Sequence, residues 1–194
     1  MSITVTAVET RVRKITRRDN TAELSAADLD AMILEACIDI SIRLLCLKTS
    51  ATGTLAGDGT SITAPTDMVK SDSAIEELYL DETLQDRITF AEWRVDKIKG
   101  YCYHNGTIYV NPASSNDRSY TLYYSTIHGA LSTNLEFEDE LKMAAIWLAA
   151  KKVFDNYVSD SNTESEKAER EYEREIHLNA PAEVIACRLR TTRE

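Results

Sequence analysis

The feature of this sequence that most constrains its fold is the dipeptide Asn105-Gly106, which lies between two β-rich runs. Asparagine and glycine readily adopt the positive φ angles of a two-residue type I′ turn, and such a turn joins antiparallel strands. The flanking runs, Tyr101–His104 and Thr107–Asn111, contain tyrosine, isoleucine and valine, which favour strands. The sequence therefore predicts a β-hairpin at this position.

Four other stretches have apolar side chains at the three- and four-residue spacings of amphipathic helices. These helices are predicted at residues 3–18, 25–47, 136–158 and 163–178. Capping boxes mark three of their starts: Ser25-Ala-Ala-Asp28, Thr133-Asn-Leu-Glu136 and Thr163-Glu-Ser-Glu166. In the last helix only Ala168, Tyr172 and Ile176 form a narrow apolar stripe, which predicts a helix that buries little within one subunit.

Residues from about 60 to about 125 are predicted to form a β-rich insertion between the second and third of these helices. Tyr120–Tyr124 is predicted as a third strand beside the hairpin, and Glu77–Asp81 alternates as a strand does. A capping box at Thr89 favours a short helix over Phe90–Ile98, although this pattern also suits a strand. Residues 49–63 are rich in Gly, Thr and Ser, and predict a loop or weak hairpin.

The predicted fold class is therefore α+β, a bundle of about four helices with a small inserted antiparallel β-sheet. We expect one domain over residues 1–180, followed by a C-terminal tail of residues 181–194. Six tyrosines are predicted to share the small sheet, and we interpret them as cross-strand packing pairs because few basic residues accompany them for stacking on nucleic-acid bases. They are Tyr101, Tyr103, Tyr109, Tyr120, Tyr123 and Tyr124.

Composition excludes several classes of function. The net charge of −10 disfavours a general nucleic-acid-binding protein, because an acidic surface repels the phosphate backbone. No apolar run approaches the roughly 20 residues of a membrane span, so no membrane contact is predicted. The four cysteines are far apart and lack the spacing of metal ligands, which favours free thiols in a reducing cytoplasm.

The charge is unevenly distributed along the chain. Residues 1–20 carry five basic and two acidic side chains, an excess of +3, so the remaining residues sum to −13. This predicted basic helix is interpreted either as a docking surface for an acidic partner or phosphate, or as a solvated helix face, which is the usual role of such charges. The basic residues are Arg11, Arg13, Lys14, Arg17 and Arg18.

No pattern in the sequence indicates catalysis. His104 at the hairpin tip, His128 in a loop and His177 on a charged helix lack the context of an activated nucleophile, so we interpret them as solvent-exposed residues. The segment Gly53–Gly59 lacks the lysine and the hydroxyl residue that follow a phosphate-binding loop. The sequence thus predicts no enzyme, no cofactor and no metal site.

Four features in this order resemble the head-to-tail adaptor (head-completion, or connector) proteins of tailed bacteriophages. An apolar second helix, Leu29–Leu47, precedes the segment Ile62-Thr-Ala-Pro-Thr-Asp-Met-Val69, where that family often has an apolar–Pro–x–Asp–apolar stretch. The hairpin region Gly100–Pro112 and the run Tyr120–Tyr124 follow, and then the helix Glu138–Tyr157. The resemblance covers roughly residues 5–180, with residues 49–60 and 71–87 outside the matched features.

The resemblance implies a structural virion protein located in the neck, between capsid and tail, and made in the host cytoplasm. Such adaptors form a ring, commonly a dodecamer, beneath the portal protein. The ring extends the DNA channel, lets the genomic DNA pass without specific binding, and docks stopper or tail proteins. In this family the helical bundle forms the ring body, and terminal segments often clasp the portal.

Two segments are the predicted contact surfaces. The resemblance makes the C-terminal tail the candidate portal contact, through Pro181, Val184, Ile185, Arg188, Leu189 and Arg190. The hairpin tip, His104, Asn105 and Gly106, is the candidate projecting assembly loop. Two other classes of function stay open at this point: an enzyme or small-ligand-binding protein whose site forms only in three dimensions, and a non-viral intracellular interaction module.

Overall fold

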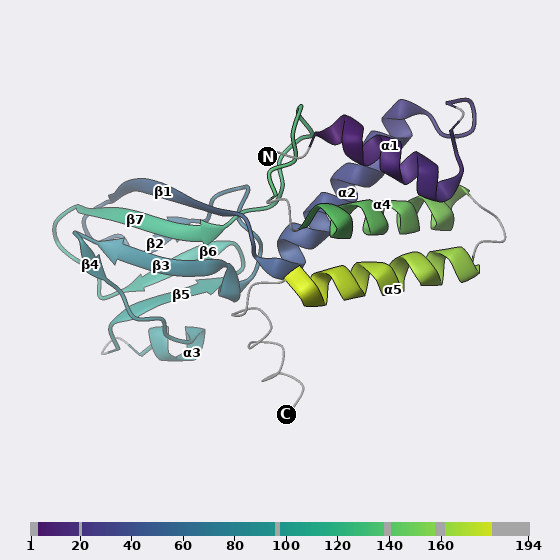
Figure 1. The fold of residues 1–194 in the computed structure, drawn as a ribbon. Helices are drawn as coiled ribbons and strands as arrows, with labels where there is room; N and C mark the ends of the chain where they lie inside the picture. Colours follow the sequence, from purple (N-terminus) through teal and green to yellow (C-terminus); the bar gives the residue numbers. More distant parts are fainter. Residues whose placement is uncertain (1–3, 20, 96–97, 138–140, 158–161, 180–194) are drawn as a thin grey trace. The chain divides into compact units, whose positions relative to one another are not determined.

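The computed structural model describes residues 4–19, 21–95, 98–137, 141–157 and 162–179. The chain divides into two compact units, which we call the helical unit (residues 1–47 and 128–194) and the β unit (residues 48–127). The predicted α+β class is confirmed, with five α-helices and two antiparallel sheets in the described part of the chain (Figure 1). A single domain over residues 1–180 stays a prediction.

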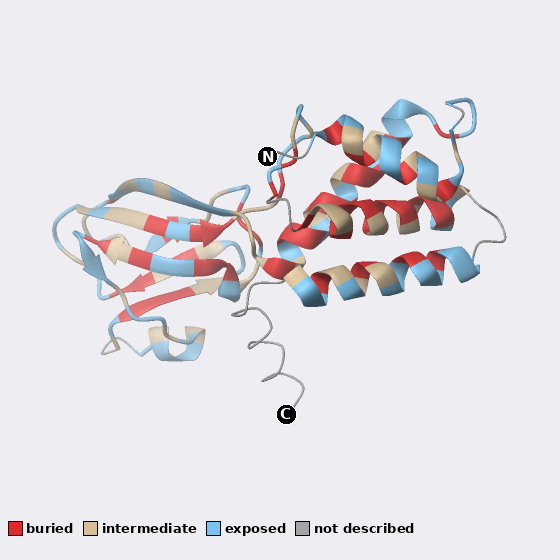
Figure 2. Cartoon of the chain, in the orientation of Figure 1, coloured by how far each residue is buried: buried red, intermediate tan, exposed pale blue. Residues whose placement is uncertain are grey.

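One apolar core holds the helical unit together. Its helices are α1 (Val5–Thr16), α2 (Ala26–Leu44), α4 (Lys142–Tyr157) and α5 (Asn162–Asn179). The largest fully buried side chains that they supply are Val8, Leu29, Ile33, Ile40, Leu44, Ile146 and Ile176. Figure 2 shows that α4 is buried over most of its surface, whereas α5 buries one stripe.

The helix starts follow from local hydrogen bonding. The side chain of Ser25 accepts a hydrogen bond of 3.1 Å from the backbone N–H of Asp28, so the predicted cap of α2 is confirmed. Thr4 caps the start of α1, and Arg17, whose φ of 55° is left-handed, caps its end after Thr16. In α5 the buried side chains are Ser165, Ala168, Tyr172 and Ile176, which confirms the predicted apolar stripe.

The third predicted helix begins later than the sequence indicated, because residues of its predicted capping box bond elsewhere. The carboxylate of Glu136 accepts a hydrogen bond of 3.0 Å from the N–H of Gly129, and the carbonyl of Thr133 accepts one of 3.1 Å from the N–H of Val5. Asn134 forms an isolated β-bridge with Thr4. This segment thus ties α1 to the connection that precedes α4, and the helix itself starts at Lys142.

The β unit contains two antiparallel sheets and not the single small sheet predicted. The four-stranded sheet has the order β1 (Lys48–Leu55), β7 (Arg118–Ser125), β3 (Ile75–Leu80) and β4 (Thr83–Leu84). The three-stranded sheet has the order β2 (Ser61–Thr63), β6 (Thr107–Asn111) and β5 (Gly100–His104). In Figure 1 the two sheets form two layers of this unit. The four-stranded sheet buries one face, on which Leu78 and Leu122 lie, whereas the three-stranded sheet has buried residues on both faces, Val110 on one and Cys102 on the other.

The predicted hairpin is confirmed. Strands β5 and β6 pair in the register His104↔Thr107, and the turn residues Asn105 and Gly106 have φ angles of 49° and 80°. Positive φ at both central residues is the geometry of a type I′ turn. The predicted capping box at Thr89 is also confirmed, and it starts the short helix α3 (Phe90–Trp93).

Two predictions about the β unit are wrong. Residues 48–55 form strand β1 where the sequence indicated a loop or weak hairpin, because eight consecutive residues pair with the distant strand β7 and this tertiary pairing outweighs the low strand propensity of Gly53. Strand β7 also pairs with β3 and not with the hairpin. The six tyrosines therefore divide between the sheets: Tyr101, Tyr103 and Tyr109 in one, and Tyr120, Tyr123 and Tyr124 in the other.

Candidate functional site

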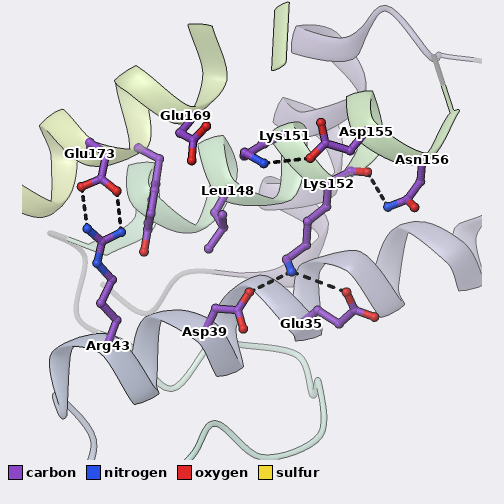
Figure 3. A pocket seen from close by; sticks show the side chains of 11 residues that line it. Glu35, Asp39, Arg43, Leu148, Lys151, Lys152, Asp155, Asn156, Glu169 and Glu173 are labelled. Carbon is purple, nitrogen blue, oxygen red and sulfur yellow. Dashed lines mark hydrogen bonds and ion pairs between the residues drawn. The ribbon is translucent and has the colours of Figure 1, made fainter. Parts of the chain in front are cut away.

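Three helices of the helical unit enclose a charged cleft of about 450 Å³, which we call the α2–α5 groove. Leu148 of α4 and Tyr172 of α5 supply its apolar surface. Figure 3 shows charged side chains entering it from α2, α4 and α5. These are Glu35, Asp39, Arg43, Lys151, Lys152, Asp155, Glu169 and Glu173.

A bidentate ion pair joins α2 to α5 at one end of the groove. The two terminal nitrogens of Arg43 donate hydrogen bonds of 2.6 and 2.5 Å to the two carboxylate oxygens of Glu173. The guanidinium also lies 5.1 Å from the centre of the Tyr172 ring, within range of a cation–π contact. These hydrogen bonds raise the pKa of Arg43 above its usual value, so the guanidinium stays charged throughout the physiological range.

Two lysines of α4 hold the remaining carboxylates. The Lys152 ammonium lies 2.8 Å from a carboxylate oxygen of Asp39 and 3.5 Å from one of Glu35, both on α2. Lys151 donates a hydrogen bond of 2.8 Å to Asp155, which also accepts one from the Ser165 hydroxyl. Burial tends to raise the pKa of Asp155, but these two hydrogen bonds outweigh it and lower the pKa.

The groove is suited to electrostatic recognition. Its five carboxylates and three basic groups give a net charge of −2 at neutral pH. Within the described residues, no three His, Cys, Asp or Glu side chains are placed to hold a metal ion, here or elsewhere. The lining contains carboxylates, basic groups, a leucine, an asparagine and a tyrosine, without a serine, cysteine or histidine to act as an activated nucleophile or base. Such a surface attracts basic side chains.

The predicted hairpin contact residues lie at the tip of β5 and β6. Asn105 and Gly106 are exposed, and a Cβ added to Gly106 would meet no atom within 4 Å. His104 is half-buried, because its ring stacks on Phe90 with centroids 4.0 Å apart and an interplanar angle of 12°. Tyr109 adds a tilted contact to Phe90 at 5.5 Å. The tip thus rests on α3 through aromatic packing, with its two turn residues open to solvent.

The structure overturns the prediction that His128 is exposed. Its side chain is fully buried, its Nε2 accepts a hydrogen bond of 3.1 Å from the N–H of Glu136, and its Nδ1 lies 2.8 Å from the carbonyl oxygen of Gly129. This geometry assigns a neutral ring with the proton on Nδ1. The backbone N–H of His128 also donates a hydrogen bond of 3.1 Å to the buried Ser41 hydroxyl. His177 is exposed, as predicted.

The five basic side chains of the predicted basic helix fall into two sets. Arg13 donates hydrogen bonds to the carbonyls of Arg18 and Leu24, and Arg18 pairs with Glu23 at 2.9 Å, so these two arginines support the fold. The other three basic side chains are exposed and form no ion pair within the described residues. They form what we call the α1 basic face: Arg11, Lys14 and Arg17.

A family model of the SU10 adaptor protein matches residues 3–190. The chain belongs to the SU10 adaptor family. This is a phage head-to-tail adaptor family, so the resemblance inferred from the sequence is confirmed. The match includes residues 49–60 and 71–87, which that resemblance had left out, and it extends into the tail. No curated protein matches the chain.

In this SU10 adaptor, the predicted portal contacts Pro181, Val184, Ile185, Arg188, Leu189 and Arg190 lie outside the described residues. None of Cys37, Cys46 and Cys102 forms a disulfide, and burial raises the pKa of the Cys37 thiol to about 12. No helix in the described part of the chain is both long and apolar enough to cross a bilayer.

Sequence reasoning missed the α2–α5 groove. The ion pair between Arg43 and Glu173 joins residues 130 positions apart, which no local pattern indicates. A partial indication was present on α2, where Glu35, Asp39 and Arg43 recur every four residues and therefore share one face of the helix.

Proposed function

We propose that this SU10 adaptor is a structural virion protein that forms a ring beneath the portal vertex, extends the DNA channel and docks stopper or tail proteins. The observation that carries the proposal is the family match, which covers residues 3–190 and thus both units of the chain. The ring is a homo-oligomer, expected to be a dodecamer, located in the neck between capsid and tail.

The two units have properties that suit different tasks in such a ring. The four helices of the helical unit share one core, as expected of the bundle that forms a ring body. The β unit presents the exposed turn Asn105-Gly106, which we assign as an assembly contact for the stopper or tail proteins. The net charge of −10 favours a channel through which DNA slides without specific binding.

The C-terminal tail is our proposed portal contact. Residues 184–190 combine the apolar side chains Val184, Ile185 and Leu189 with the basic side chains Arg188 and Arg190. A segment of this composition offers apolar anchors and positive charge to a partner. The tail lies within the family match as far as residue 190.

Mixing the purified chain with the portal protein of the same phage tests the function. Negative-stain microscopy should show a ring added to one face of the portal. A variant truncated after Ala180 should stay folded, by circular dichroism and thermal unfolding, and should bind the portal less tightly. Wild-type protein that adds no density to the portal would contradict the adaptor role, whereas undiminished binding by the truncated variant would contradict only the role of the tail.

A further inference from the structure

We propose that the α1 basic face of one copy docks on the α2–α5 groove of a second copy, and that this contact joins neighbouring subunits. The inference rests on the proposed function, because a ring requires one surface of each subunit to bind a different surface of the next. Both surfaces, the α1 basic face and the α2–α5 groove, belong to the helical unit.

The α1 basic face has positive charge with no partner within the described residues. Arg11, Lys14 and Arg17 are exposed, while Val5, Val8 and Val12 are buried on the opposite side of the helix. Residues three apart in a helix are neighbours on its surface, so Arg11 and Lys14 stand close together, and Arg17 follows as the residue that caps the end of the helix. Arg13 and Arg18, the other two arginines of this region, form internal contacts and therefore support the fold. The three exposed basic side chains stay available to a partner.

The groove has the complementary charge. Its lining carries a net charge of −2, and the side chain of Glu35 is 65% exposed. Glu169 is exposed, and within the described residues it interacts with Lys151 through its charge without forming a close ion pair. A helix the length of α1 is about 18 Å long and 10 Å wide, larger than a cleft of about 450 Å³. Basic side chains therefore enter the groove while α1 itself stays outside it.

The two surfaces lie on different parts of the helical unit. Helix α1 packs against α4 and α2, and α5 packs against α4. In Figure 1, α4 lies between α1 and α5. A contact from one patch to a different patch is heterologous, so it repeats from copy to copy and closes into a ring if the rotation allows. Charge complementarity of this kind fixes which surfaces meet and suppresses wrong pairings.

A charge-swap experiment tests the inference. One variant carries Arg11→Glu and Lys14→Glu, and a second carries Glu35→Lys and Glu169→Lys. Like charges facing one another should weaken self-association of each variant alone by about tenfold or more, measured by sedimentation with and without the portal protein. An equimolar mixture should recover assembly, because each altered face then meets an oppositely charged partner and both kinds of contact are restored.

Matched controls separate this contact from general effects of charge. Lys167→Glu with Arg170→Glu makes the same change in charge on the exposed surface of α5, and should assemble as the wild type does. Raising NaCl from about 50 mM to about 500 mM should weaken wild-type association, because the pairing charges are exposed. A mixture that associates no better than its components, or two variants that both assemble normally, would overturn the inference.

Two other outcomes also decide the matter. If the α1 variant assembles normally but loses affinity for duplex DNA that the wild type binds, the α1 basic face binds phosphate and the inference is wrong. If the wild type binds the portal as a ring, and each charge-reversed variant fills the same number of places on the portal as the wild type does, the proposed function stands and the inference is wrong. Wild-type protein that neither self-associates nor binds the portal would overturn both.

Discussion

The hydroxyl of Tyr124 donates a hydrogen bond of 3.0 Å to Oδ1 of Asp67. The other carboxylate oxygen of Asp67 accepts a 3.1 Å bond from the hydroxyl of Thr126. Asp67 belongs to the Pro-Thr-Asp-Met stretch through which the sequence resembled phage adaptors, and Tyr124 lies on β7. Asp67 lies in a turn, and its side chain therefore ties this stretch to an inner strand of the four-stranded sheet.

Replacement of Asp67 should destabilise the β unit. Asp67→Ala leaves the partly buried Tyr124 hydroxyl without its acceptor, so we expect a loss of about 1 kcal/mol in the free energy of unfolding, and a smaller loss for Asp67→Asn. Urea denaturation followed by far-ultraviolet circular dichroism measures it. The matched control is Asp86→Ala, an exposed aspartate whose side chain forms no hydrogen bond within the described residues. Equal stability of the Asp67→Ala and Asp86→Ala variants would refute the role of Asp67.

The same hydrogen bond should make stability depend on alkaline pH. Burial, together with the Asp67 carboxylate, raises the pKa of Tyr124 to about 12, from about 10 in the unfolded chain. The folded state therefore holds the phenol proton more tightly, so this contribution is complete below pH 10 and falls as pH rises towards 12. The free energy of unfolding of the wild type minus that of Tyr124→Phe should shrink over this range. A difference that is constant with pH would contradict the assignment, and Tyr123→Phe, at an exposed position on the same strand, serves as control.

The elements that the sequence predicted well are those whose signals are local. The turn Asn105-Gly106, the cap at Ser25 and the apolar stripe of α5 each depend on residues within one or two turns of chain, and the structure has all three. The capping pattern at Thr133–Glu136 was equally local, yet Glu136 bonds to Gly129 and His128 instead. Tertiary contacts outweighed a cap that contributes only about 1 kcal/mol.

The rest of the fold depends on contacts between distant residues. Strand β1 exists because it pairs with β7 about seventy residues later, as in the register Lys48↔Ser125, and its own composition is that of a loop. The candidate site also depends on contacts between residues that are distant in the sequence. The α2–α5 groove forms only when three helices meet, and Arg43 reaches Glu173 across 130 positions. Periodicity predicts which helix face is apolar, but not which charged residue meets which.

The buried ring of His128 should be essential to the helical unit. His128→Ala removes the acceptor for the Glu136 N–H and leaves a cavity, so we expect a loss of about 3 kcal/mol in the free energy of unfolding. His128→Gln, which can both donate and accept, should lose less. The exposed His177→Ala variant should change stability by less than about 0.5 kcal/mol. Thermal and urea unfolding compare the three, and a His128→Ala variant as stable as His177→Ala would show that the buried network is dispensable.

The ion pair of Arg43 and Glu173 should fasten α5 to α2. A double-mutant cycle of Arg43→Ala, Glu173→Ala and the double variant should give a coupling free energy of about 1 kcal/mol, since the side chains are 30% and 39% exposed and solvent screens the pair. Arg43→Lys should recover only part of it, because an ammonium group cannot make the bidentate contact. Amide hydrogen exchange in α5 should accelerate in Arg43→Ala. A coupling energy near zero, with unchanged exchange, would show that packing on α4 alone holds the helix.

The β unit should fold when separated from the helical unit. Its first strand begins at Lys48, which pairs with Ser125 at the end of its last strand, so the Cα atoms of these two residues lie about 5 Å apart. It also buries apolar residues of its own, among them Leu78, Ile108 and Leu122. We therefore expect residues 48–127 expressed alone to unfold in one cooperative transition, monitored by circular dichroism. Residues 60–127, which lack β1, should not, because β7 then loses its partner along one edge. An unfolded 48–127 fragment would instead support the single domain that the sequence predicted over residues 1–180.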